Sequence, residues 1–137
     1  MTEQEKLEYI NRECNTNYTS LDKVDWYIIS TFRKLSEDFI REFSDNVNWL
    51  SISANQTLSE DFIKEFKYEV NWVCISQYKN LSIDFIREFQ DKLDWEHISQ
   101  CYNLSKDFLR EFKHRIDWCT FFCREDIRDI LIDKMIN

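Results

Sequence analysis

Cysteine and histidine side chains form two pairs whose spacing could serve a metal ion. His97 and Cys101 are four residues apart, as are Cys119 and Cys123, and this spacing places both members of a pair on one helix face. Thiolate and imidazole are the ligands of zinc sites, but the spacing is not that of a common zinc finger. Helix packing would also hold neighbouring copies of a repeat about 9–10 Å apart. We therefore expect free cysteines, with no metal and no other cofactor.

Carboxylates and hydroxyls that could catalyse a reaction recur along the chain. A glutamate follows an aspartate by four residues at Glu42, Glu65, Glu88 and Glu111, and a serine follows a tryptophan by four residues at Ser30, Ser53, Ser76 and Ser99. Acid–base and nucleophilic catalysis need one distinctive environment and a partnered base, and no histidine recurs with these groups. We expect structural roles instead. The glutamates should join an ion-pair ladder and accept from a neighbouring tryptophan N–H, and the serines should bond back to the carbonyl four residues earlier.

A 23-residue repeat positions these groups. Tryptophan recurs at this interval at Trp26, Trp49, Trp72, Trp95 and Trp118. Four full copies span 35–57, 58–80, 81–103 and 104–126, and a half copy spans 24–34; seven of the 23 positions are identical in all four copies. Such periodicity is typical of proteins in which each copy packs against its neighbours.

Each copy predicts two short helices of about nine residues. Serine precedes the first helix as a typical N-cap, at Ser36, Ser59, Ser82 and Ser105, and Asn48, Asn71, Asp94 and Asp117 hold the same place before the second. The chain contains neither glycine nor proline, so hairpin-rich β folds are disfavoured and Asn or Asp should supply any left-handed positions. A leucine-rich repeat can share this period, and its strand would be the segment that starts at each tryptophan. In the third copy this segment is WEHISQ, which does not alternate between apolar and polar residues as a strand would.

The predicted fold is therefore all-α, an α-solenoid of stacked short helical hairpins in a single domain, 1–137. Residues 1–23 and 127–137 are expected to be its N- and C-terminal caps, although the C-terminal helix could instead bind a partner. Eight phenylalanines should form the core at two repeat positions. They are Phe39, Phe43, Phe62, Phe66, Phe85, Phe89, Phe108 and Phe112.

Sequence variation among the copies predicts the binding surface. It concentrates just after each tryptophan and at the end of each copy, where a fixed framework could present changing side chains. Drift at solvated positions would leave the same pattern. The candidate protein-binding residues are Leu50, Ser51, Val73, Cys74, Gln77, Glu96, His97 and Gln100. We expect Glu96 and His97 to be exposed beside buried Trp95 and Ile98.

Charge and composition exclude several classes of function. The net charge is -8, whereas nucleic-acid binding normally requires a basic surface. No stretch approaches the roughly 18 apolar residues of a membrane span, and MTEQEKLEYI lacks the apolar core of a signal peptide. Five cysteines without a CxxC pair favour reduced thiols in an intracellular compartment.

The pattern LSxDFIREFxxxVxWxxIS over residues 24–126 resembles tandem repeats in uncharacterised proteins of mimivirus-like large DNA viruses of amoebae. The resemblance implies a viral protein in the host cytoplasm and carries no catalytic residue onto this chain. The sequence thus favours a non-catalytic scaffold that binds a protein of the host cell or virus, as a monomer or with weak self-association. The alternative is a self-associating assembly component without a separate ligand.

Overall fold

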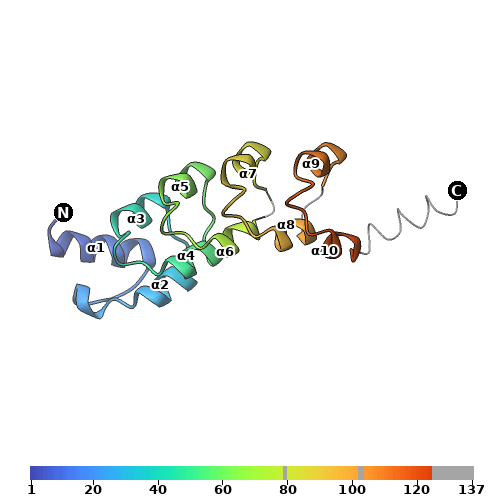
Figure 1. The fold of residues 1–137 in the computed structure, drawn as a ribbon. Coiled ribbons are helices and arrows are strands. Elements are labelled where there is room, and N and C mark those ends of the chain that lie inside the picture. Colours follow the sequence, from blue (N-terminus) through green and yellow to red (C-terminus); the bar gives the residue numbers. More distant parts are fainter. Residues whose placement is uncertain (79, 102–103, 125–137) are drawn as a thin grey trace, which may run out of the picture. The chain divides into compact units, whose positions relative to one another are not determined.

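A computed structural model describes residues 1–78, 80–101 and 104–124 (Figure 1). Over these residues the chain forms ten α-helices, one short 3-10 helix and no strand, which confirms the all-helical repeat fold. The chain divides into two compact units, residues 1–71 and 72–137, and each unit is considered separately below.

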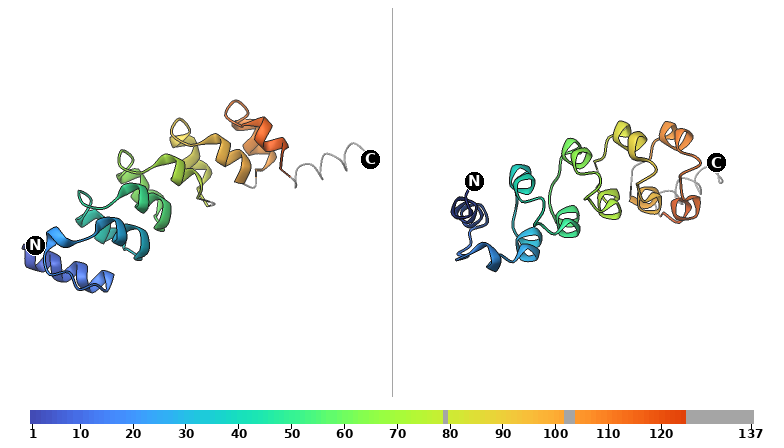
Figure 2. Two further views of the ribbon diagram at one scale, coloured as in Figure 1. Left: turned by 90° about the horizontal axis from the view of Figure 1, so that it is seen from below. Right: turned by 60° about the vertical axis from the view of Figure 1, so that its left-hand side comes forward.

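Unit 1 contains an N-terminal helix followed by two rows of short helices. The rows are visible in the right-hand view of Figure 2, with α3 and α5 in one and α2 and α4 in the other. The helices are α1 (Glu3–Cys14), the 3-10 helix η1 (Leu21–Lys23), α2 (Trp26–Phe32), α3 (Glu37–Glu42), α4 (Trp49–Asn55) and α5 (Glu60–Glu65).

Unit 2 repeats the two-row arrangement. The first helix of each copy lies in one row and the second helix lies in the other (Figure 2). The helices are α6 (Trp72–Ser76), α7 (Ile83–Phe89), α8 (Trp95–Cys101), α9 (Lys106–Glu111) and α10 (Trp118–Phe122).

The repeated serines begin the first helix of each copy, as predicted. The hydroxyl of Ser36 accepts from the backbone N–H of Phe39, and Ser59, Ser82 and Ser105 make the equivalent bond. Each satisfies one of the backbone donors that a helix leaves unpaired at its N-terminus. The repeat helices have five to seven residues, so the expected length of about nine is wrong. A turn that follows the first helix takes up the difference.

Left-handed backbone occurs at an asparagine, the residue type expected to supply it, and not at a repeated position of the described links. Among the described residues only Asn15, which ends α1, has a positive φ, of 52°. The N-cap residues of the repeat helices take extended backbone, such as φ -75° and ψ 155° at Ser36. Extended backbone is open to every residue type, and this is how the chain makes its short links without glycine.

Aromatic side chains fill the space between the two rows and join one copy to the next. In unit 2 the Trp95 ring lies 6.3 Å from Phe108 and 5.3 Å from Phe112, both in the following copy. In unit 1 Trp49 lies 6.4 Å from Phe62 and 5.0 Å from Phe66. Seven of the eight predicted core phenylalanines are buried and Phe66 is half-buried. The phenylalanine core is thus confirmed, whereas four of the five tryptophans are only half-buried and Trp118 is exposed.

The N-terminal helix covers the first copy of unit 1. Tyr9 of α1 packs on Phe39 at 5.4 Å and on Phe43 at 5.9 Å between ring centroids. Leu7, Ile10 and Cys14 of the same helix are buried. Helix α1 thus packs where the N-terminal cap was predicted, whereas the predicted C-terminal cap, 127–137, lies outside the described residues.

Candidate functional site

The repeated serines hold the framework together through hydrogen bonds. In unit 1 the Ser53 hydroxyl donates to the Trp49 carbonyl at 2.7 Å and accepts from the backbone N–H of Asn71 at 2.9 Å. In unit 2 Ser99 does the same with the Trp95 carbonyl, at 2.6 Å, and with the N–H of Asp117, at 2.9 Å. The predicted bond to the carbonyl four residues earlier is confirmed for Ser53, Ser76 and Ser99. The second bond ties each serine to the following copy.

Two of the repeated glutamates, Glu65 and Glu111, form the expected ion pairs between copies, whereas Glu42 pairs with Lys6 of α1 at 3.9 Å. Glu65 binds Arg41 of the preceding copy at 2.9 Å in unit 1, and Glu111 binds Arg87 in the same way in unit 2. This contact holds the pKa of Glu111 below its usual value. The indole N–H groups of Trp49, Trp95 and Trp118 donate to backbone carbonyls and not to these glutamates. The Trp95 indole N–H donates to the backbone carbonyl of Gln90 at 2.8 Å, because the turn before the second helix brings that carbonyl to the ring.

A single glutamine joins the half copy to the first full copy in unit 1. The Gln56 side chain is buried, donates to the carbonyls of Ser30 and Arg33 at 3.0 and 2.7 Å, and accepts from the N–H of Leu35 at 3.0 Å. Sequence reasoning missed this residue because the end of each copy is variable, and the equivalent position is Arg33 in the half copy and Lys79 in the next. Variation therefore does not always indicate a surface position.

The predicted binding residues are divided between the two units. In unit 1 Leu50 is exposed, but Ser51 is buried. Its hydroxyl accepts a hydrogen bond from the Thr31 hydroxyl at 3.0 Å. Its assignment to the surface is therefore wrong, since the side chain faces the preceding helix. In unit 2 four of the six predicted residues are exposed, and Cys74 and His97 are half-buried. The four exposed residues are Val73, Gln77, Glu96 and Gln100.

The unit 2 residues include one direct contact. Nε2 of Gln77 and Nε2 of His97 are 3.4 Å apart, and Nδ1 of His97 lies 3.2 Å from the Asp94 carboxylate that caps α8. The structure thus confirms the exposure expected for Glu96 and the burial expected for Ile98. Trp95 and His97 are both intermediate, because the edge of the indole and the imidazole reach solvent.

Large apolar side chains are exposed on the second-row helices of unit 1. Phe32 of α2 is 72% exposed and Leu50 of α4 is 59% exposed, and Tyr27 and Ile28 of α2 are exposed as well. Helices α2 and α4 pack against each other, so these four residues lie on adjoining elements. We name them the apolar face of unit 1. Sequence reasoning had placed three of the four at variable positions and had overlooked Phe32.

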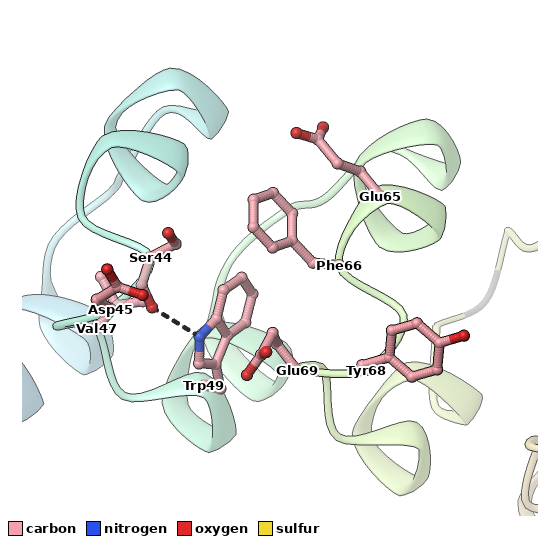
Figure 3. Close-up of a pocket in the computed structure, with 8 residues that line it drawn as sticks. All are labelled: Ser44, Asp45, Val47, Trp49, Glu65, Phe66, Tyr68 and Glu69. Atoms are coloured by element: carbon pink, nitrogen blue, oxygen red, sulfur yellow. Dashed lines mark hydrogen bonds between the residues drawn. The ribbon is translucent and has the colours of Figure 1, made fainter.

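A hollow of about 370 Å³ lies beside Trp49 in unit 1 (Figure 3). Its walls come from the turn between α3 and α4 and from the end of α5. Figure 3 shows Phe66 and Glu69 on one side of the Trp49 indole and Asp45 on the other. Ser44, Val47, Glu65 and Tyr68 complete the lining.

The Trp49 hollow combines an aromatic floor with acidic walls. The Trp49 indole N–H is already bonded to the Ser44 carbonyl at 3.0 Å, which fixes the ring. Asp45, Glu65 and Glu69 are exposed carboxylates around it. An aromatic face with nearby negative charge attracts cations. Sequence reasoning missed the hollow because it assigned every tryptophan wholly to the core.

The described cysteines lie in contrasting environments. Cys14 is buried, and burial raises the pKa of its thiol to about 11. Cys119 and Cys123 are exposed and Cys74 is intermediate, whereas the side chain of Cys101 lies outside the described part of the chain. No group of three His, Cys, Asp or Glu side chains able to hold a metal ion occurs within the described ranges.

Comparison with known proteins yields no relative. No protein-family model matches the chain, and neither a curated protein nor a solved structure matches it. The described helices also include none with the length and hydropathy needed to cross a membrane. Any functional assignment must therefore be argued from the exposed features of the repeat framework.

Proposed function

We propose that this protein is a non-catalytic repeat scaffold that binds a protein partner through the apolar face of unit 1. The observation that carries the proposal is the exposure of Tyr27, Ile28, Phe32 and Leu50 on adjoining helices. Large apolar side chains that stay exposed on neighbouring helices mark candidate protein-interaction sites. The second-row position is the one where the repeat varies, which allows the surface to change without disturbing the framework.

The bonds of the framework support a non-catalytic role. Ser53 and Ser99 use their hydroxyls in two hydrogen bonds each, and Glu65 and Glu111 are paired with arginine. The residues that could have acted as nucleophile or acid are therefore committed to packing between copies. We further propose an intracellular partner, from the host cell or from the virus that the repeat pattern suggests.

Partner capture with matched variants tests the proposal. Phe32→Ser together with Leu50→Ser removes two large contacts of the apolar face, and such contacts near the centre of an interface carry much of its energy. We expect cross-linked partner recovery to fall about tenfold or more, because 1.4 kcal/mol corresponds to a factor of ten in affinity. Ile83→Ser is the control, since Ile83 is exposed on a first-row helix of unit 2.

The self-association alternative predicts a different result. If the apolar face joins copies of this chain, the solution mass should rise with concentration, and the Phe32→Ser, Leu50→Ser variant should remain monomeric at every concentration. Light scattering of the wild-type chain over a dilution series separates the two readings. Unchanged partner recovery by the folded double variant would contradict the proposal.

A further inference from the structure

We propose that the Trp49 hollow is a subsite for a cationic side chain, most specifically the guanidinium of an arginine on the bound protein. The inference rests on the proposed protein-binding function and names the chemistry of one contact. It is carried by a comparison between the copies of the repeat, which shows where the framework supplies its own cation and where it does not.

The hollow has negative charge that the chain leaves uncompensated. Of its three carboxylates, Glu65 already binds the guanidinium of Arg41 at 2.9 Å. Asp45 and Glu69 make no ion pair with any residue in the described part of the chain. Two like charges that line one hollow repel each other, and a cation placed between them relieves that repulsion.

Unit 2 shows what occupies the same repeat positions elsewhere. Two copies further along, Asp45 is matched by Asp91 and Glu69 by Arg115. Asp91 and Arg115 form a direct ion pair. The remaining equivalents are closely similar, with Trp95 for Trp49 and Glu111 for Glu65. The framework therefore places a cation opposite this aspartate in unit 2 and a third carboxylate there in unit 1.

A second position in unit 2 shows a cation on the tryptophan itself. Lys92 occupies the repeat position of Glu69 and lies 6.0 Å from the Trp72 ring centroid. This distance is within the range of a cation–π contact. The repeat thus brings this position to the face of the preceding tryptophan. In the copy that contains Trp72 the position holds Lys92, and beside Trp49 the same position holds the acidic residue Glu69.

Arginine suits the hollow better than a compact ammonium ion. A planar guanidinium can stack on an indole while its N–H groups bind carboxylates at its edge. Trp49 offers the ring, held by its bond to the Ser44 carbonyl, and Asp45 and Glu69 offer acceptors on opposite sides of it (Figure 3). Arginine is also enriched at protein interfaces.

Titration with single amino-acid derivatives tests the subsite without a partner. Nα-acetyl-arginine amide is added to the full chain while the indole N–H signals are followed by NMR. We expect a saturable shift of the Trp49 signal. Nα-acetyl-citrulline amide is the matched control, since it keeps the planar group without its charge. Its affinity should be lower by a factor of about ten or more. Equal responses to the two compounds, or none at Trp49, would overturn the inference.

Two charge reversals test the comparison between copies. Glu69→Arg should supply the missing cation internally, by analogy with Asp91 and Arg115, and abolish the Trp49 response in a folded chain. Arg115→Glu should create a second hollow beside Trp95 and raise the stoichiometry from one to two. Should Arg115→Glu unfold, Glu69→Gln replaces it and should weaken the Trp49 response. A folded Glu69→Arg chain that still binds would contradict the proposal, as would a folded Arg115→Glu chain with one site.

The result separates this inference from the proposed function. If Trp49 responds to the arginine derivative but no protein partner is captured, the proposed function fails and the cation subsite stands. If a partner is captured equally by the wild-type chain and by Glu69→Arg, the proposed function stands and the assignment of this contact is overturned.

Discussion

The Ser53 hydroxyl connects two successive copies of the repeat by accepting from the backbone N–H of Asn71, 2.9 Å away and 18 residues further along. The same hydroxyl donates to the Trp49 carbonyl. A small side chain is required because the serine is fully buried between helices. The repeat thus depends on a hydroxyl, and a residue of the same size without one should not replace it.

Ser53→Ala is therefore expected to destabilise the protein by about 1–3 kcal/mol, because it removes the acceptor of the partly buried N–H of Asn71. Urea unfolding followed by tryptophan fluorescence measures the change. Ser44→Ala is the control and should stay within about 0.5 kcal/mol, since the half-buried Ser44 serves Trp49 through its backbone carbonyl. Equal effects of the two substitutions would show that the Ser53 hydroxyl contributes nothing specific.

Gln56→Ala should destabilise unit 1 by about 3 kcal/mol, because three backbone groups would lose a buried partner. These groups are the carbonyls of Ser30 and Arg33 and the N–H of Leu35. Hydrogen exchange resolved by residue is the sharper measurement, since protection should fall first at Leu35. Thr57→Ala, at the exposed neighbouring position, should leave both stability and protection unchanged.

These two residues show what the sequence could and could not predict. Serine at a fixed interval after tryptophan predicted its own structural role, because identity in register indicates contact between copies. Gln56 occurs once, so no periodicity marks it, and only the positions of the backbone carbonyls show that it is buried. The Trp49 hollow was hidden for a related reason. A tryptophan ladder predicts packing, but the fraction of each indole that reaches solvent depends on the turn beside it.

The tryptophans should differ in their contribution to stability according to what each one contacts. Trp95 packs on Phe108 and Phe112 of the following copy, so Trp95→Ala should destabilise by about 3 kcal/mol. Trp118 packs on Phe121 and Phe122 of its own helix and is 37% exposed. We expect about 1 kcal/mol for Trp118→Ala. Calorimetry of both variants would contradict the assignment if the order were reversed.

The ion pair between copies in unit 2 should be visible in the acid titration of one carboxyl group. Arg87 binds Glu111 through its guanidinium, and this bond holds the pKa of Glu111 below the usual 4.5. A carboxyl group whose pKa is lower in the folded chain stabilises that chain above its unfolded pKa, and this stabilisation is lost as the pH falls through the folded value. NMR titration of the Glu111 side-chain carbon should therefore give a midpoint below 4.5. Arg87→Gln should return the midpoint to its ordinary value.

Arg110→Gln is the matched control, because it removes the same charge from the helix that carries Glu111 while Arg110 faces Asp107 at 3.6 Å. An equal shift in both variants would mean that general charge, and not the bond between copies, sets the pKa of Glu111.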